Sequence, residues 1–401
     1  MASSCVRKVD RAFSMLLVYY FLLQFFVFEG VIVGASSVLY FAFVVPSFAV
    51  CLVGYCFSFM TRGFSFSRVE LVFLGFFFFS LFVCLFRSDI DSAKYVIALS
   101  LLPLFVFRLR PSVSVGLINF LFIFSIFATT AAYFFGYSNY LPVLGFSKDG
   151  QLPWRGSLLP QVATGAIFSL LVFVVNLSKF GEGRRYRILV VLAAAMVIFS
   201  GLRTAIICMF LALLYFVFLF RKRSNSHFFC HLAVVFLFTA LFVVFVLSTQ
   251  IILLLQDYVP IVLFQYLFRG EAGYIDADSL RQSVYRGWLW LQHILIWQQN
   301  PLWGFGSFTL DEMTFGEKIA ANGTGSESFF TGLLARCGIV SAFLFVLALV
   351  LNANCAFKNG WRHSLIILLL FFITMLSYGS YVNSYDFLAM LFFSLLSVRP
   401  R

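Results

Sequence analysis

Charge is scarce in this sequence, and most of it is positive. Asp, Glu, Lys and Arg make up 11% of the 401 residues, with 16 acids against 28 bases, whereas 62% of the residues are hydrophobic. Soluble globular domains carry about 25% charged residues, which keep their surfaces in water. The scarcity of charge excludes that class and predicts a protein that crosses a membrane several times.

Common catalytic and metal-binding signatures are missing as well. The 8 cysteines show no metal-ligand spacing, and neither a P-loop nor a nucleophile elbow is present. The pairs Asp89-Ile90-Asp91 and Asp276-Ala277-Asp278 resemble a divalent-cation site only in a three-residue pattern, which loop solvation explains. His293 is interpreted as part of the packing of a helix. We therefore predict no metal and no cofactor.

Long hydrophobic runs dominate what is present. A helix needs about 17–25 residues to cross a hydrocarbon core roughly 30 Å thick, because all its backbone polar groups must be satisfied inside the segment. The runs predict an all-α fold with about twelve transmembrane helices, of which the fourth, seventh and twelfth are short. Their approximate limits are 13–34, 37–57, 69–86, 95–107, 113–135, 161–178, 188–202, 204–220, 231–252, 328–352, 363–380 and 385–398.

The basic residues give the predicted helices an orientation. If both termini are cytoplasmic, most of the 28 basic residues fall in cytoplasmic segments, with only Asp10, Glu70 and Glu182 of the 16 acids. This bias follows the positive-inside rule. Basic residues spread over short segments determine topology, so the net charge of +12 does not indicate nucleic acid. The first run, which follows Arg7, Lys8 and Arg11, is predicted to be an uncleaved signal anchor.

One polar segment interrupts the hydrophobic pattern. The chain is predicted to divide into helices within 1–252, a long outward-facing loop at 253–327 and further helices within 328–401. Within the loop, apolar residues recur at helical spacing until Asn300-Pro301 ends the pattern. The loop is expected to be partly helical, with one face on the membrane surface or on the spans beneath it. No internal repeat is visible, which counts against a transporter built from repeats.

Arginines near the expected membrane surface are candidates for binding an anion. Arg203 stands at a tight turn between two spans, and Arg281 and Arg286 lie on the predicted loop helix. A guanidinium group stays charged and pairs in a forked geometry with phosphate oxygens, so several of them together suit a pyrophosphate. Each residue also has a simpler interpretation, in which its side chain reaches the lipid head groups.

Glu327 is the acid placed where the long loop meets the tenth span. A carboxyl at such a boundary is a candidate general base, because partial burial would raise its pKa. The alternative is a helix cap, in which Ser326 or Glu327 satisfies the free amides of the next helix.

Three pieces of the sequence together resemble the O-antigen polymerase and ligase superfamily of bacterial membrane glycosyltransferases. Ser200-x-x-Arg203-Thr204 is similar to its Ser-x-Ser-Arg-Thr/Gly signature. Arg286-x-x-x-Trp290 followed by Pro301-Leu302-Trp303-Gly304-Phe305-Gly306 is similar to its Arg-x-x-x-Trp and His-Pro-Leu-x-Gly-Val-Gly elements. The run from Glu327 to Gly338 is similar to the His-Asn-x-x-Leu start of the next span. A weaker fourth piece is Arg155-Gly156-Ser157, and the resemblance covers roughly 150–352.

The resemblance implies a GT-C-like polytopic enzyme at the periplasmic face of the bacterial inner membrane. It implies a metal-independent, inverting transfer of oligosaccharide repeat units carried on undecaprenyl pyrophosphate. Glu327 is then the expected catalytic base, and the expected pyrophosphate ligands are Arg203, Arg286, Arg281 and Arg155. Four tryptophans are expected to stack on sugars or to anchor the loop in head groups: Trp154, Trp288, Trp290 and Trp303. The expected partners are the lipid-linked glycan donor and acceptor, membrane lipid and a regulator of chain length.

Two departures from the family pattern affect the choice between activities. Ligases of the superfamily usually have His at the position of Glu327, and members often have an acid at the position of Arg336. Glu327 therefore favours an O-antigen polymerase. One alternative is an O-antigen ligase that transfers glycan to the lipid A core, and a second is a flippase or other transporter without catalysis.

Overall fold

The protein is described by a computed structural model that covers residues 2–26, 49–59, 65–134, 162–200, 202–221, 231–241, 243, 290, 293–307, 328–377 and 387–397. Within these ranges all regular secondary structure is helical and no strand is present, so the predicted all-α class is confirmed. The labelled helices are α1 (Ala2–Phe26), α3 (Arg68–Phe86), α4 (Ile90–Leu109), α5 (Val115–Phe134), α6 (Val162–Leu177), α7 (Arg184–Ser200), α8 (Arg203–Arg221), α12 (Phe329–Lys358), α13 (Ser364–Ser377) and α14 (Phe387–Ser397).

The helices follow the predicted hydrophobic runs closely. Among the described helices, α3, α4 and α12 are long and apolar enough to cross a membrane, and shorter apolar helices occupy most of the other runs. The chain is therefore a membrane protein. The count of twelve spans stays a prediction, because several of the runs lie partly outside the described residues.

Several helices differ from their predicted limits, and α1 and α4 show the differences at the N-terminal end. The helix α1 begins at Ala2 and not at residue 13, and α4 covers Ile90–Leu109, longer than the predicted 95–107. A helix does not have to end where the hydrocarbon ends, since its first turn can be held by a cap in the polar region. For α4 that cap is Asp89, whose Oδ1 accepts a hydrogen bond of 3.0 Å from the Ser92 amide.

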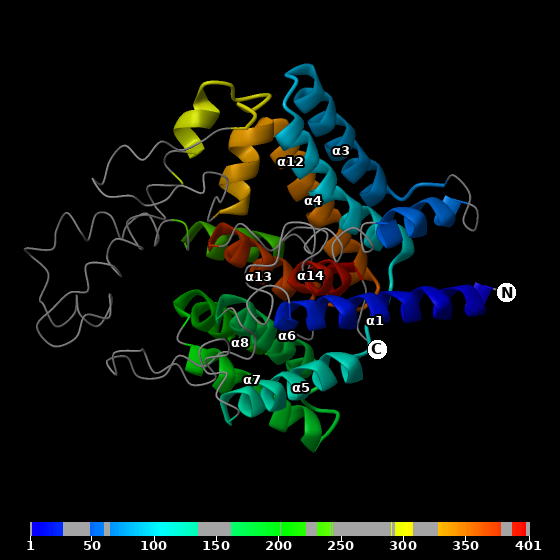
Figure 1. Cartoon of the computed structure of the whole chain (residues 1–401). Helices are drawn as coiled ribbons and strands as arrows, with labels where there is room; N and C mark the ends of the chain where they lie inside the picture. Colours follow the sequence, from blue (N-terminus) through cyan, green and yellow to red (C-terminus); the bar gives the residue numbers. More distant parts are fainter. Residues whose placement is uncertain are drawn as a thin grey trace, which may run out of the picture.

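The helices α13 and α14 form the centre of the molecule. Every side chain of α14, and of α13 as far as its described residues reach, is buried, as expected for helices that are apolar on all sides. In Figure 1 these two helices lie between α3, α4 and α12 on one side and α5, α6, α7 and α8 on the other. The helix α12 packs along α3, and α3 packs along α4, so these three form one group.

Short polar side chains tie neighbouring helices together inside the apolar interior. The Asn119 and Asn176 amides donate to each other over 3.0 and 2.7 Å between α5 and α6. Ser80 donates to Ser341 over 2.8 Å between α3 and α12. Such pairs hold transmembrane helices in register, because an unpaired polar group in an apolar surrounding is costly.

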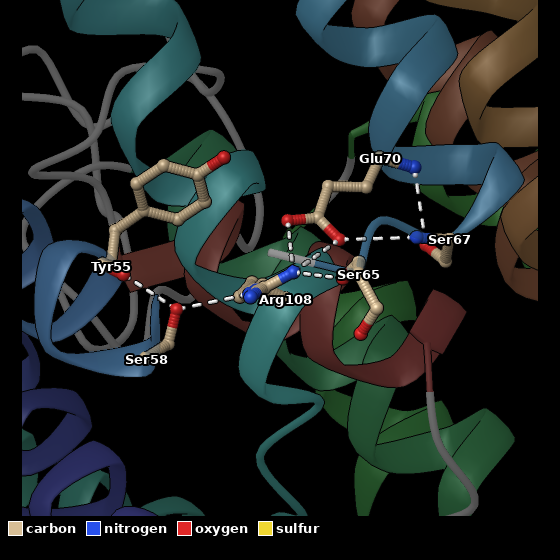
Figure 2. A network of polar contacts seen from close by, with 6 residues as sticks. All are labelled: Tyr55, Ser58, Ser65, Ser67, Glu70 and Arg108. Atoms are coloured by element: carbon tan, nitrogen blue, oxygen red, sulfur yellow. Dashed lines mark hydrogen bonds and ion pairs between the residues drawn. The ribbon is translucent and has the colours of Figure 1, made fainter. Parts of the chain in front are cut away.

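A buried ion pair joins α3 and α4 at the end where α3 begins (Figure 2). Arg108 Nη1 lies 3.2 Å from Glu70 Oε1, and both side chains are 3% exposed. The guanidinium also donates to Ser58 Oγ and to the Ser65 carbonyl, and it lies over the ring of Phe59. Glu70 in addition completes the capping box of α3 with Ser67. The pair has many partners, which is the condition under which a buried ion pair is tolerated.

Candidate functional site

The longest of the described helices, α12, is interrupted near its N-terminal end, which follows Glu327 in the sequence. In α12, Gly338 has φ 78° and ψ 176°, a conformation outside the helical region. The part after the break, from Ile339 to Lys358, rises about 1.5 Å per residue and so reaches roughly 30 Å, the thickness of a hydrocarbon core. The part of α12 after the break is therefore by itself long enough to cross a membrane.

The long loop fills the break with backbone hydrogen bonds. The amides of Phe305 and Gly306 donate to the carbonyls of Ala335 and Arg336 over 2.6 and 3.1 Å. In return the amide of Ile339 donates to the Pro301 carbonyl over 3.0 Å. The groups that the break releases are therefore satisfied by the loop, as irregular backbone at membrane depth requires. We call residues 301–306 and the break at Gly338, together with the turn at Arg87–Asp89 described next, the loop joint.

The turn between α3 and α4 completes the loop joint. The Arg87 guanidinium donates from Nη1 to the Gly304 carbonyl. The Asp89 carboxylate accepts a hydrogen bond of 2.5 Å from the Ser307 amide, while its other oxygen caps α4. These contacts join parts of the chain 217 and 218 residues apart. The loop is thus held from both sides, by α12 and by the α3–α4 turn.

The loop joint requires glycines because its segments approach each other too closely for side chains. Gly304 and Gly338 have φ of 73° and 78°, and a side chain on either would collide with the backbone of the other segment. A Cβ on Gly306, whose φ is 96°, would lie 2.7 Å from Asp89 Oδ2. Gly is favoured where φ is positive and where backbones meet. Two of the motifs that carried the resemblance, the Pro301-to-Gly306 run and the Gly338 position, are therefore one structural unit.

The surroundings of Asp89 in the loop joint change the pKa of its carboxyl group. Burial by itself raises the pKa of this carboxyl, but hydrogen bonds from Ser92 and Ser307 act in the opposite direction and outweigh it. The net pKa of Asp89 is lowered below its ordinary value, because the hydrogen bonds favour the charged form. Asp91, the second acid of the Asp-x-Asp pair, instead forms an exposed ion pair of 3.1 Å with Lys94. The two acids of the pair thus have different roles.

A second contact between the loop and α12 involves His293. Its imidazole is 1% exposed, and Nδ1 lies 2.9 Å from Thr331 Oγ1 in the first turn of α12. Burial, and after it the positive charge of Arg336, lowers the pKa of His293 to about 4. Arg336 is itself buried, with its guanidinium 5.3 Å from the centre of the Tyr95 ring. The predicted packing role of His293 is confirmed, and a hydrogen bond to α12 is added to it.

Glu327 lies outside the described residues, but the residue after it is placed. Ser328 is the N-cap of α12, with extended backbone and a side-chain oxygen that accepts a hydrogen bond of 3.4 Å from the Thr331 amide. The capping role that the sequence offered to Ser326 or Glu327 thus belongs to Ser328. Glu327 adjoins the turn that His293 contacts.

The predicted arginines are placed only in part. Arg203 is the first residue of α8, and α7, the preceding helix, ends at Ser200. A cation at a helix N-terminus is opposed by the helix dipole, so this position does not favour the stability of α8. Arg155, Arg281 and Arg286 lie outside the described residues, and whether they meet Arg203 stays a prediction.

The two tryptophans that the structure describes have different surroundings. Trp290 is 3% exposed and belongs to the hydrophobic core. Trp303 is 43% exposed and stacks on Phe79 of α3, with ring centroids 5.3 Å apart and an interplanar angle of 17°. Trp154 and Trp288 lie outside the described residues. The predicted sugar-binding or anchoring role of all four stays a prediction.

The sequence interpretation missed three residues that build this region, Arg87, Asp89 and Arg336. Asp89 had been assigned to loop solvation, and its capping of α4 was signalled by its place before Ile90 at the start of an apolar run. Its contact with Ser307 had no local signal, since it joins distant parts of the chain. The loop joint brings the start of α12 and the loop helix together in a fixed arrangement.

Part of the chain that builds this region also matches a known protein family. Residues 188–346 match the family model described as O-antigen ligase, a stretch that contains Arg203, Arg286, Glu327 and most of the loop joint. A search of the curated proteins finds no match. Members of the matched family are glycosyltransferase-like membrane enzymes that act on lipid-linked glycans. The match confirms the resemblance of this stretch, 188–346, to the O-antigen polymerase and ligase superfamily.

Proposed function

We propose that this protein is an O-antigen polymerase, which joins oligosaccharide repeat units carried on undecaprenyl pyrophosphate at the periplasmic face of the bacterial inner membrane. Both termini are then cytoplasmic, and the loop joint lies at the periplasmic surface. The family match supports a glycan-transferring enzyme in a membrane. The observation that favours a polymerase is Glu327, which occupies the position where ligases of the superfamily usually have His.

The proposed reaction is a single displacement at the anomeric carbon of the donor sugar. Glu327 takes the proton of an acceptor hydroxyl as that oxygen forms a bond to the anomeric carbon. The bond from this carbon to the pyrophosphate oxygen breaks, and undecaprenyl pyrophosphate leaves with the electron pair. Attack from the face opposite the leaving group inverts the configuration of the carbon. No metal takes part in this proposal.

The arginines act on the leaving group. Negative charge grows on the pyrophosphate as the bond breaks, and fixed cations placed there stabilise the transition state by several kcal/mol. We assign this role to Arg203 and Arg286, with Arg281 and Arg155 as accessories. The N-terminal position of Arg203 on α8 supports the assignment, because helix stability does not account for a cation there.

Catalysis by purified protein tests the proposal. Reconstituted protein with synthetic undecaprenyl-pyrophosphate repeat units is expected to form chains of two or more units and to release undecaprenyl pyrophosphate. Glu327→Gln keeps the shape of the side chain without its basicity, so we expect a fall in kcat of about 10²-fold or more. Full activity of Glu327→Gln would show that the base is another group.

An O-antigen ligase is the second candidate, and the description of the matched family favours it. A ligase uses the same donor, but its acceptor is the lipid A core. Deletion of the gene separates the candidates. Loss of a polymerase leaves surface lipid capped by one repeat unit, loss of a ligase leaves no capped lipid, and loss of a flippase leaves repeat units at the cytoplasmic face.

A further inference from the structure

The side chain of His293 connects the long loop to the turn that follows Glu327. His293 lies on the helical stretch 293–298 of the loop, and its Nδ1 is 2.9 Å from Thr331 Oγ1 of α12. The imidazole is 1% exposed, so lipid and water do not compete for this contact. The proposed mechanism gives His293 no role.

Thr331 passes this contact on to Ser328. Its hydroxyl lies 3.5 Å from the Ser328 carbonyl, and its amide donates to Ser328 Oγ over 3.4 Å. Ser328 is the N-cap of α12 and is bonded to Glu327 through the backbone. The first turn of α12, which directly follows Glu327 in the sequence, is therefore held in part by the atom that Thr331 contacts on the loop.

His293 acts here as a neutral group. Burial and the charge of Arg336 hold its pKa at about 4, so the imidazole is uncharged near pH 7. Within the described residues, Arg336 on α12 is the charged group that acts on this imidazole. A neutral imidazole cannot serve as a cation for the pyrophosphate, and its burial separates it from a substrate. A neutral, buried imidazole can still form the hydrogen bond to Thr331.

We propose that His293 is a positioning residue for the base: through Thr331 it holds the first turn of α12, the turn that Glu327 directly precedes in the sequence. This inference rests on the proposed function. A displacement of about 1 Å in a reacting group lowers a rate by roughly 10²-fold, so one contact of this kind influences turnover strongly.

Steady-state kinetics of variants at both ends of the contact test the inference. His293→Leu and Thr331→Val are each expected to lower kcat about 10- to 100-fold with KM changed by no more than about 2-fold, because substrate binding is retained while the base is displaced. The acid limb of the kcat profile is expected to shift, since Glu327 changes its surroundings. The double variant is expected to be no slower than the slower single variant, because both changes remove one contact.

Two conservative variants and one remote variant separate positioning from general destabilisation. His293→Asn and Thr331→Ser keep a polar atom at the contact and are expected to recover most of kcat. Asn119→Leu removes a buried hydrogen bond between α5 and α6, so it controls for lost stability at a distance. It is expected to lower thermal stability while kcat per folded molecule stays near the wild-type value.

The outcomes distinguish this inference from the proposed function. An active wild-type protein whose His293→Leu variant keeps its kcat and its acid limb, and loses only stability, would overturn the positioning role alone. A lowered kcat that His293→Asn fails to recover, with additive effects in the double variant, would overturn it as well. A wild-type protein that forms no linkage from lipid-linked units would overturn the proposed function and this inference together.

Discussion

Gly338 of α12 and Gly304 of the long loop meet so closely that a Cβ on Gly338 would lie 2.5 Å from the Gly304 nitrogen. Neither backbone can move away easily, because hydrogen bonds from Phe305, Gly306 and Ile339 hold the two segments together. The contact makes the loop joint the most sharply defined part of the candidate site, and it gives the first prediction.

Gly338→Ala is expected to separate the loop from α12. The new side chain meets backbone atoms, and a residue other than Gly with this φ and ψ costs about 1–3 kcal/mol in addition. Thermal unfolding in detergent measures the loss. The matched control is Gly75→Ala on α3, where nothing lies within 4 Å of the added Cβ, and a gain of up to about 1 kcal/mol is expected. Equal stability of the two variants would contradict the loop joint.

Removal of one partner of the buried ion pair is expected to destabilise the group of α3 and α4. Arg108→Leu leaves the Glu70 carboxylate buried without its cation, at a cost of about 3–5 kcal/mol. Adding Glu70→Leu is expected to restore part of that loss, although the cap of α3 is weakened. Lys94→Ala breaks the exposed pair with Asp91 and serves as control, with about 0–1 kcal/mol expected. A double variant less stable than Arg108→Leu would argue against this account.

Acid is expected to loosen the contact between Asp89 and the loop. The folded-state pKa of Asp89 is lowered, so the stabilisation is fully present above the unfolded-state pKa of about 3.9 and is lost as pH falls through the folded-state value. Cleavage by pepsin near Ser307 should therefore rise at low pH. Asp89→Asn should be cleaved readily at every pH tested. Asp91→Asn, which leaves the Ser307 contact intact, should behave as wild type.

Arg286→Lys tests the role of the forked guanidinium in the proposed reaction. Lysine keeps the charge but cannot pair with two phosphate oxygens at once, so kcat is expected to fall at least about 10-fold. Arg187→Lys on the exposed side of α7 is the control and should turn over normally. The measurement is release of undecaprenyl pyrophosphate by reconstituted protein. A normal rate for Arg286→Lys would remove this residue from the leaving-group site.

Hydropathy predicted much of the fold because lipid imposes a simple requirement on each helix. The run at 161–178 became α6 (Val162–Leu177), and the run at 204–220 became α8 (Arg203–Arg221). The break at Gly338 was not predicted, since a single glycine is tolerated inside a helical pattern. The loop explains the break, because its backbone forms hydrogen bonds with the groups that the break leaves without helical partners.

Residue type and position were enough to name candidate site residues, whose roles stay predictions, but contacts between distant parts of the chain could not be predicted. Arg203, Arg286 and Glu327 could be named from their charge, their position and the family resemblance. The contact of Asp89 with Ser307 depends on a fold that joins two parts of the chain far apart in sequence. His293 had the correct packing role, but its partner Thr331 follows from the path of the loop.

The turn that carries Arg87 and Asp89 lies outside the matched stretch 188–346, although it holds the loop of that stretch in place. A chimaera that exchanges only the matched stretch between two relatives would therefore combine the loop of one protein with the α3–α4 turn of the other. A chimaera that takes α3 and α4 from the same relative as the loop should acquire that relative's donor or acceptor preference more often.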